Sequence, residues 1–410
     1  MGTVSRRTRL ASLCVVGTLL CVPAVFAGER PFAVANDTDP PSPPIDLRSK
    51  EANAPPHVKA KLQQMRQFIQ QNQLPFTVGY TTRTEMPVPS AQPTPDDKGR
   101  TAESIQRQNN EAAAVIQRDR IPSVEEILRQ RELPLNLAQG SMSTTAPPTT
   151  GIRPRSVTNE TPSDTSSDTP ATAETPAPAD EVQSRSVATC AARSSFVYSA
   201  TYLAPIRNQG SCGSCWAFAG GGIVDSSYRI RYARNANVAE QELVDCAGGL
   251  ANAVINGCGG FFIESTMLHL QLDGVAWEAN YPYVAQDRGT CSNPAWSYKI
   301  STWGWVGIGF ASVTEIKNAL CAYGPVATTI DATDLFQDYT GGVFQEKPRS
   351  QYGVVPITNH AVMIVGWDDS KQAWRVKNSW GTGWGESGYA WVKYNHNAIG
   401  WNTVFAVARQ

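Results

Sequence analysis

The carboxy-terminal half of this 410-residue sequence predicts an α+β fold, with helices first and a sheet afterwards. Every tryptophan of the chain lies beyond Ser194, so the apolar core belongs to this half. Apolar spacings of three and four predict helices over residues 217–232, 239–246 and 261–272. Strand-like runs follow at residues 326–330, 361–367, 373–377 and 389–394. Segregation of helices from strands indicates an α+β domain long enough for two packed lobes.

The first 27 residues have the pattern of a secretory signal peptide. Arginines near the start precede an apolar run that ends at Phe26, before the small residue Ala27. A membrane anchor is the alternative, but Gly17 and Pro23 interrupt the run, which is short for a span. We therefore expect secretion, or delivery to a periplasm or lumen, with no membrane span once the signal is removed.

The cysteine count predicts a free thiol. Cys14 and Cys21 leave with the signal, and an odd set remains. These are Cys190, Cys212, Cys215, Cys246, Cys258, Cys291 and Cys321. Exported proteins normally pair their cysteines, and bridges use them two at a time. One thiol is therefore left over.

Composition divides the rest of the chain into three parts. Residues 28–139 are expected to be a partly helical pro-region. Residues 140–187 consist mainly of Ser, Thr, Pro, Ala and Asp, which predicts a disordered linker open to proteolytic nicking. Residues 188–410 carry the core. The chain has 35 Lys+Arg and 36 Asp+Glu, so its charge indicates no nucleic-acid partner.

Within the pro-region, residues 28–56 are expected to be irregular because they are rich in proline. Helices are predicted over residues 57–73 and 102–118, and another begins at Ser123, where the spacing of a capping box occurs. Residues 76–80 predict a short strand.

The segment from Gln209 to Phe218 reads Gln-Gly-Ser-Cys-Gly-Ser-Cys-Trp-Ala-Phe and places Cys215 between a Gly/Ser-rich turn and a helical run. A thiol attacks a carbonyl group as a thiolate, so a nucleophilic cysteine needs a lowered pKa. The positive end of a helix dipole stabilises such an anion. Cys215 is therefore the predicted nucleophile.

His360 is the predicted general base, by elimination. The core-bearing half contains His269 inside a helical run, His396 in a polar turn, and His360 at the start of a strand-like run. A residue at the start of a strand can face a cleft while the strand behind it is buried. Asn378 ends the next strand-like segment, where its amide oxygen could orient the imidazole, and Trp380 could shield that bond.

The Cys-Gly-Ser-Cys-Trp sequence at Cys212–Trp216 resembles the signature of the papain family, with His and Asn about 130–150 residues downstream. His360 falls in this range, and Asn378 lies slightly beyond it. Further blocks resemble the family in the same order: Gln241–Cys246, Asn256–Gly260, Tyr281–Tyr283, Asn359–Val362 and Lys377–Tyr389. The resemblance covers about residues 195–410 and implies a cysteine peptidase with a helical lobe and a lobe built from an antiparallel sheet or barrel.

The resemblance also implies roles for individual residues. Gln209 would bind the oxyanion together with the Cys215 backbone N–H. Cys212 would pair with Cys258, and Cys246 with Cys291, which leaves Cys190 and Cys321 for a third bridge. The implied substrate is a peptide or protein, no cofactor or metal is expected, and the chain is expected to be a monomer. Gly259, Gly260, Asn359, Trp380, Trp384 and Val404 would line the substrate site.

The sequence departs from the family pattern at several places. The glycine run reads Cys258-Gly-Gly-Phe261, where the family has Cys-Asn-Gly-Gly, and Asn359 stands where papain has Asp. The pro-region lacks the usual helical pattern of family prodomains, so inhibition by it is inferred from position, with residues 76–80 as the segment expected to cross the cleft. Val404 would form an apolar pocket base that favours a hydrophobic residue two before the cut.

Three alternatives stay open from the sequence. Cys212 and Cys215 form a C-x-x-C pair, as in thiol–disulfide oxidoreductases, which predicts a bond between them. A zinc site would need Cys246 and Cys258 as well, but these lack the usual spacing. An inactive protein that kept the fold for binding is the third.

Overall fold

The structure is a computed structural model that describes residues 46–89, 101–139, 190–247, 257–292, 295–347, 349–351 and 355–410. The predicted signal peptide, most of the predicted linker and parts of the predicted pro-region lie outside the described residues. No helix in the described ranges is long and apolar enough to cross a membrane.

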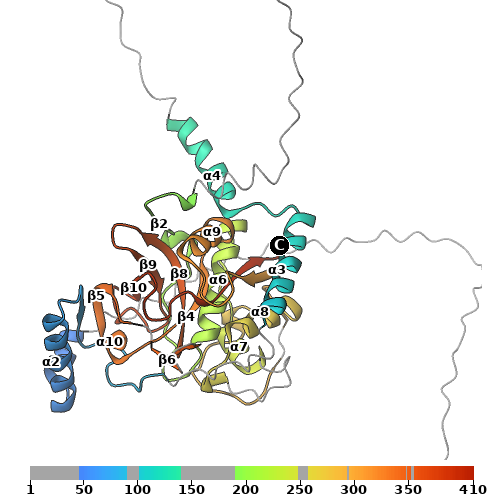
Figure 1. Ribbon diagram of the computed structural model, residues 1–410. Helices are drawn as coiled ribbons and strands as arrows, with labels where there is room; N and C mark the ends of the chain where they lie inside the picture. The colour runs from blue at the N-terminus through green and yellow to red at the C-terminus, as the bar shows by residue number, and fades with distance from the viewer. Residues whose placement is uncertain are drawn as a thin grey trace, which may run out of the picture. The chain divides into compact units, whose positions relative to one another are not determined.

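A long central helix, α6 (Cys215–Tyr232), is the centre of the helical lobe (Figure 1). Its sequence is apolar on nearly every side, and almost all of its side chains are buried, as expected for a helix inside a core. It ends at Ala233, which adopts the left-handed conformation. Two helices pack against it: α7 (Glu240–Cys246) and α8 (Ile263–Leu272). Three short 3₁₀ turns accompany them: Ala200–Tyr202, Gly257–Gly259 and Glu278–Asn280.

The second lobe is a nine-stranded sheet with the order β1-β5-β10-β9-β8-β4-β11-β3, in which β2 also pairs with β8. Its first strand, β1 (Phe76–Val78), comes from the amino-terminal part of the chain. Its strands in the core-bearing half are β2 (Ser195–Val197), β3 (Ile300–Trp305), β4 (Val326–Ile330), β5 (Tyr339–Phe344), β8 (His360–Asp368), β9 (Ala373–Lys377), β10 (Tyr389–Lys393) and β11 (Trp401–Ala408). A separate small ribbon joins β6 (Ser350–Gln351) to β7 (Val355–Pro356). Strand β8 is buried over nearly its whole length and packs against α6.

The predicted α+β fold is therefore confirmed, with one difference in the sheet. Strands β5 and β10 run parallel, whereas the other pairs are antiparallel. Parallel neighbours need a long connection, and here β8 and β9 lie between β5 and β10 in the chain.

Two helices in this lobe had not been predicted. Helix α9 (Val313–Tyr323) begins with a capping box in which Ser312 and Glu315 each bond the other's backbone N–H. Gly324 follows it with φ of 109°, a conformation open to glycine. The short α10 (Asp334–Gln337) is capped by Thr333. The capping-box spacing at Ser312 is the signal that could have revealed α9.

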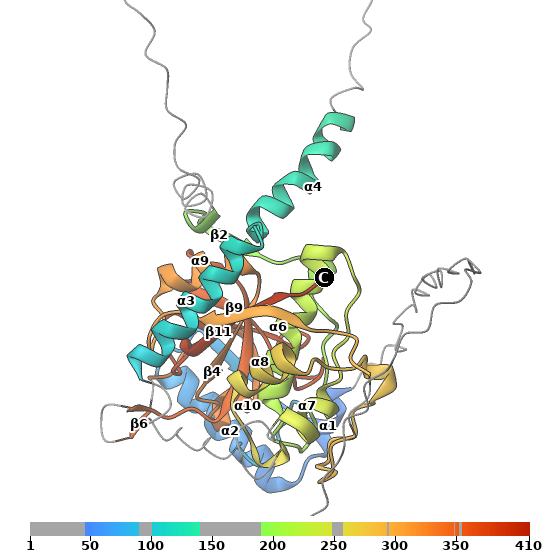
Figure 2. The same ribbon diagram turned by 90° about the vertical axis from the view of Figure 1, so that its right-hand side faces the viewer.

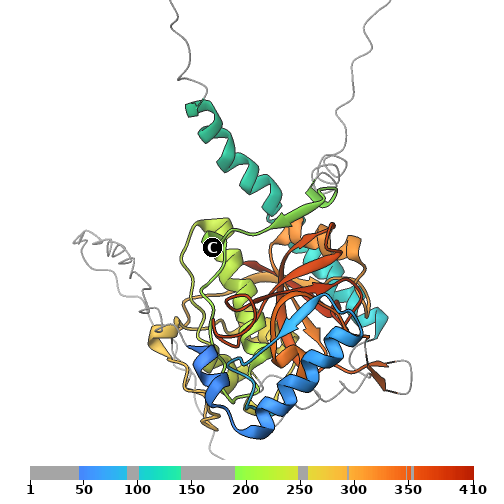
Figure 3. The same cartoon turned by 90° about the vertical axis from the view of Figure 1, so that its left-hand side faces the viewer.

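The amino-terminal segment, residues 46–89, contains α1 (Leu47–Asn53), α2 (Pro56–Gln71) and β1 (Phe76–Val78). Helix α1 corrects the prediction of irregular chain up to residue 56, because the Asp46 side chain caps the Ser49 N–H after the proline-rich run has ended. Strand β1 pairs with β5 at the edge of the sheet, beside α2 (Figure 3). Residues 76–78 therefore extend the sheet. The later residues of this segment approach the cysteine turn, which is the turn of residues 209–214 that leads to Cys215.

A second part of the predicted pro-region lies against a different surface. The helical brace, residues 101–139, comprises α3 (Ala102–Arg118) and α4 (Val124–Gln139), which begins where Ser123 caps the Glu126 N–H. Helix α3 lies along β3, and α4 contacts α6 and α9 (Figure 2).

Candidate active site

Cys215 is the first residue of α6 and is the only free cysteine in the described parts of the chain. The backbone N–H groups of Ala361 and Trp216 act to lower the pKa of its thiol. Ala361 directly follows His360 in β8, so the sheet brings the start of that strand to the amino terminus of α6. A thiolate here would face both the helix dipole and these N–H groups.

His360 is completely buried, and its Nε2 lies 2.8 Å from Asn378 Oδ1. The antiparallel pairing of β8 and β9 places the start of one strand beside the end of the other, as the sequence predicted. Trp380 stacks on the imidazole with ring centroids 4.4 Å apart and is itself fully buried. Nδ1 has no hydrogen-bond partner among the described residues, so it is the nitrogen left to exchange a proton with a neighbouring group.

Gln209 lies in the turn that leads to α6 and is held against the end of β9. Its backbone N–H donates to the Ser379 carbonyl at 2.8 Å, and the Ser379 hydroxyl donates to Gln209 Oε1 at 2.7 Å. The Gln209 Nε2 donates to the Cys212 carbonyl at 2.9 Å. The side-chain amide is therefore fixed at its oxygen end, and its N–H₂ group remains close to the cysteine turn.

The acid–base pair is neutral in this form of the protein. Burial raises the pKa of Cys215 to about 11, against the effect of the backbone hydrogen bonds. Burial also lowers the pKa of His360 to about 3, which the hydrogen bond to Asn378 opposes. At neutral pH the proton therefore stays on sulfur and the imidazole is uncharged, the opposite of the ion pair that thiol catalysis needs.

The amino-terminal segment places a buried cation beside this pair. The Arg83 guanidinium donates from Nη1 to the Gly210 carbonyl at 3.0 Å and lies 4.9 Å from the centre of the Trp380 ring. Its positive charge also lowers the pKa values of both Cys215 and His360. Arg83 is itself 5% exposed, so this cation is enclosed beside the cysteine–histidine pair.

Further bonds hold the same segment in place on either side of Arg83. The Thr82 hydroxyl donates to the Trp380 carbonyl at 2.6 Å, and the Thr82 N–H donates to the Gly383 carbonyl. Asn359 donates from Nδ2 to the Pro89 carbonyl at 3.0 Å. Residues within 82–89 thus bond to groups at the site, whereas in the expected segment 76–80 residues 76–78 pair with β5.

The cysteines pair as Cys212–Cys258, Cys246–Cys291 and Cys190–Cys321. These are the bridges implied by the resemblance, together with the third one left over. Cys212 is therefore bonded to Cys258 and not to Cys215, which argues against a dithiol oxidoreductase. The same bonds remove three of the four thiols that a zinc site would need.

The expected substrate-lining residues lie in four different environments. Gly259, Gly260 and Asn359 lie beside the cysteine turn or the histidine: the Gly213 N–H donates to the Cys258 carbonyl, and Asn359 precedes His360. Trp380 stacks on His360 as described. Trp384 lies behind Trp380, with ring centroids 5.3 Å apart, and donates to the Phe336 carbonyl, so it supports Trp380.

Val404 is completely buried in β11, where it pairs with Trp305 of β3 and Ala327 of β4. This environment is apolar, as expected, but it is the interior of the sheet. The role of Val404 at the base of a substrate pocket stays a prediction.

Arg83, Thr82 and Tyr283 lie at the site but were not predicted as site residues from the sequence. The Tyr283 hydroxyl donates to the Gln209 carbonyl at 2.8 Å and lies 2.6 Å from the Ser214 hydroxyl, so it braces the cysteine turn. Tyr283 belongs to one of the family-like blocks, which was the available signal. Arg83 and Thr82 lie in an ordinary polar stretch, and nothing in the sequence distinguishes them.

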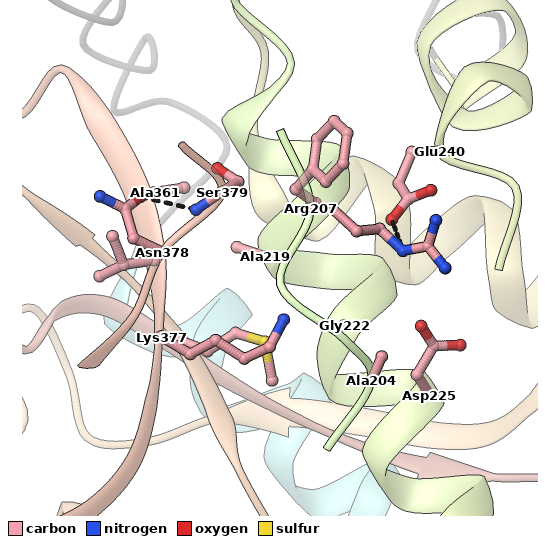
Figure 4. A pocket seen from close by; sticks show the side chains of 13 residues that line it. Ala204, Arg207, Ala219, Gly222, Asp225, Glu240, Ala361, Lys377, Asn378 and Ser379 are labelled. Atoms are coloured by element: carbon pink, nitrogen blue, oxygen red, sulfur yellow. Dashed lines mark hydrogen bonds and ion pairs between the residues drawn. The ribbon is translucent and has the colours of Figure 1, made fainter. Parts of the chain in front are cut away.

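A small pocket lies beside the cysteine–histidine pair, between α6, the start of β8 and the end of β9 (Figure 4). Charged side chains line it: Arg207, Asp225, Glu240 and Lys377. Arg207 pairs with Glu240 at 3.6 Å, and burial raises the pKa values of Glu240 and Asp225. Burial lowers the pKa of Lys377 to about 8, although Asp225 and Glu240 oppose this shift. This buried cluster connects the helical lobe to the strand that presents Asn378.

A free cysteine at a helix start, a histidine and an orienting amide together are suited to nucleophilic acyl transfer. Comparison with known proteins agrees with this class. The family model "Papain family cysteine protease" matches residues 191–408, and the chain belongs to this family.

Two curated relatives illustrate the similarity. The chain is 37% identical over 184 residues to digestive cysteine proteinase 1 of Homarus americanus, an alignment covering 44% of this chain and 55% of that protein. It is 34% identical over 184 residues to cathepsin K of Mus musculus, covering 44% and 53%. The alignments thus span only about half the length of these relatives.

One solved structure matches most of the chain. Digestive procathepsin L 3 of the Tenebrio molitor larval midgut aligns with a TM-score of 0.54 and 22% identity, covering 86% of this chain and 89% of that one. At this identity the match shows the fold alone.

Proposed function

We propose that the chain is the latent precursor of an exported cysteine endopeptidase that cuts peptide bonds through Cys215, His360 and Asn378. The observation that supports this most strongly is the joint placement of a free thiol on the α6 amino terminus and an imidazole anchored at Nε2. Membership of the papain family of cysteine proteases supports the same proposal.

In the active form, a Cys215 thiolate paired with protonated His360 attacks the carbonyl carbon of the scissile peptide bond. The carbonyl oxygen becomes an oxyanion, for which the Gln209 amide and the Cys215 backbone N–H are the available donors. His360 then gives its proton to the leaving nitrogen as the C–N bond breaks, and a thioester on Cys215 remains.

Water completes the cycle. Neutral His360 removes a proton from water, the resulting hydroxide adds to the thioester carbonyl, and the C–S bond breaks to release the acid and the thiolate. Asn378 fixes the ring through Nε2 in both steps, so Nδ1 always carries the exchanged proton. Trp380 keeps bulk water away from the His360–Asn378 bond.

Latency follows from the amino-terminal segment. Its residues Thr82, Arg83 and Pro89 bond to groups that border the cysteine–histidine pair, where a substrate would have to lie. We infer that this segment is an intramolecular inhibitor and that its release admits both water and substrate. The substrate class is peptides or proteins, and the enzyme acts as a monomer.

Export is part of the proposal. Three disulfides join cysteines in the core-bearing half, and such bonds persist in oxidising compartments. Together with the signal-like start of the sequence, they favour a secreted, periplasmic or lumenal location.

The test uses the full chain with a sequence-specific protease site inserted within residues 90–100, so that one cut separates the amino-terminal segment from the rest. Fluorogenic peptides with a hydrophobic residue two before the cut are supplied before and after cleavage. We expect hydrolysis only after cleavage, and none from the Cys215→Ala version of the same chain. Absence of hydrolysis across varied peptides in a folded, cleaved protein would favour an inactive binding protein instead.

A further inference from the structure

The helical brace lies on a surface away from the cysteine–histidine pair. Helix α3 runs along β3, the last strand of the sheet order, and α4 starts against α6 and α9 (Figure 2). None of the hydrogen bonds described for Cys215, His360, Asn378 or Gln209 involves it. Nothing in the proposed chemistry therefore requires the brace to leave.

Side chains of the brace form hydrogen bonds to backbone groups of the edge strand β3. Asn109 accepts a hydrogen bond from the Trp305 N–H at 2.8 Å through Oδ1, and Gln108 donates from Nε2 to the Trp303 carbonyl at 2.9 Å. A Cβ at Gly304 would lie 2.7 Å from the Phe405 ring and 3.0 Å from Asn109 Oδ1, so glycine leaves room for both side chains. An uncovered edge strand carrying two large aromatic side chains would be a site for pairing with other chains.

Both helices of the brace place side chains in the core. Val124 is completely buried and Ala112 is 1% exposed. Arg231 of α6, itself 9% exposed, donates from Nη1 to the Pro122 carbonyl at 2.8 Å. In turn, Arg131 of α4 donates a hydrogen bond to the Arg231 carbonyl. Removal of the brace would uncover apolar surface and take the carbonyl partner from a buried guanidinium, both of which are unfavourable.

We propose that the helical brace is a permanent part of the mature enzyme. When the precursor is processed on both sides of it, the brace stays bound to the core-bearing half as a second, separate chain. The predicted pro-region thus contains two parts with different fates: the amino-terminal segment, which blocks the site, and the brace, which completes the fold. This inference goes beyond the proposed function and does not depend on it, because its main readout is binding.

The experiment uses the full chain with two different protease sites, one inserted within residues 90–100 and one within residues 140–189. After both cuts, the protein is passed over a size-exclusion column under native conditions, and the chains in the main peak are identified by intact mass. We expect the brace at one copy per core-bearing chain. Elution of the brace apart from a soluble, folded core would overturn the proposal, whether or not the core is active.

Two neighbouring asparagines provide a matched pair of variants in the doubly cut protein. Asn109→Ala removes a bond to the edge strand, and we expect about tenfold faster loss of the brace on dilution. Asn110→Ala is the control, because its side chain is exposed and bonds only Gln106 of the same helix in the described contacts. Val124→Ala tests the core contact independently and should also speed dissociation by about tenfold or more. Equal rates in all variants would contradict the proposal.

Discussion

The Arg83 guanidinium lies 4.9 Å from the centre of the Trp380 ring, and the same ring is stacked on His360 at 4.4 Å. A cation from the amino-terminal segment is thus held one aromatic ring away from the imidazole that must become charged for catalysis. Its charge disfavours protonation of His360 and adds to the effect of burial. The proposed latency therefore has an electrostatic component at the imidazole besides simple blockage, while the same charge favours the Cys215 thiolate.

Replacing Arg83 should weaken latency. Arg83→Met keeps much of the side-chain volume but loses the cation and the bond to the Gly210 carbonyl. We expect the uncut variant to hydrolyse peptide at least about tenfold faster than the uncut parent, since a lost charged hydrogen bond is worth about 1.5–3 kcal/mol. Arg48→Met is the matched control, because Arg48 is exposed on α1. Equal rates for the two variants would exclude a role for the Arg83 charge.

Alkylation of Cys215 should report the same change directly. In the uncut chain, burial raises the pKa of this thiol to about 11, so little thiolate exists at pH 7. We expect iodoacetamide to react at least about 100-fold faster once the amino-terminal segment has been removed. In the uncut protein the rate should still rise between pH 8 and 10, measured by intact mass. A fast reaction at pH 7 in the uncut chain would contradict this interpretation.

Asn378 should act through the orientation of His360. In the cleaved enzyme, Asn378→Ala is expected to lower kcat by about 100-fold with little change in KM, because the ring loses its anchor at Nε2. Asn378→Asp keeps an acceptor and adds a negative charge, which raises the pKa of His360. The alkaline limb of the kcat/KM profile should then move to higher pH. Identical profiles for both variants would indicate a merely structural asparagine.

Glu242 should make the folded state less stable as the pH rises. Burial raises its pKa from 4.5 to about 7, against the hydrogen bond from the Ala276 N–H. Between these values the unfolded chain binds fewer protons than the folded one, so stability falls with increasing pH in this window. Glu242→Gln has no carboxyl group at this position and so does not lose stability in this window. We expect the difference in Tm between this variant and the parent to be about 3 °C larger in favour of the variant at pH 8 than at pH 5.

Glu111→Gln is the control for this measurement, because Glu111 is exposed on α3. Its Tm difference from the parent should be the same at both pH values. If Glu242→Gln behaved in the same way, Glu242 would not be the group responsible.

Much of the fold could be predicted because local signals agreed with the final packing. The predicted bounds of α3, β4 and β9 are those of the structure. The sequence did not predict β2, β3, β5 or β11. Glycines interrupt the apolar patterns of β3 and β5, and the pairing of all four depends on distant strands. Sequence periodicity does not contain this information.

The candidate site also contains residues that the sequence could predict and residues that it could not. Cys215, His360 and Asn378 could be selected because each follows or precedes a recognisable element, and β8–β9 pairing brings two of them together. Arg83 could not, because its partners Gly210 and Trp380 are far away in the sequence and its own surroundings are ordinary. A contact of this kind follows only from the path of the whole chain.

We expect Cys215 to carry the acyl group during peptide-bond hydrolysis. The most direct test mixes the cleaved enzyme with an activated peptide ester, quenches the reaction in acid within the first turnover, and determines the intact mass and the labelled residue. We predict an increase equal to the acyl group, located on Cys215 and absent from the Cys215→Ala protein. Turnover with no adduct, or an adduct on another residue, would contradict the account.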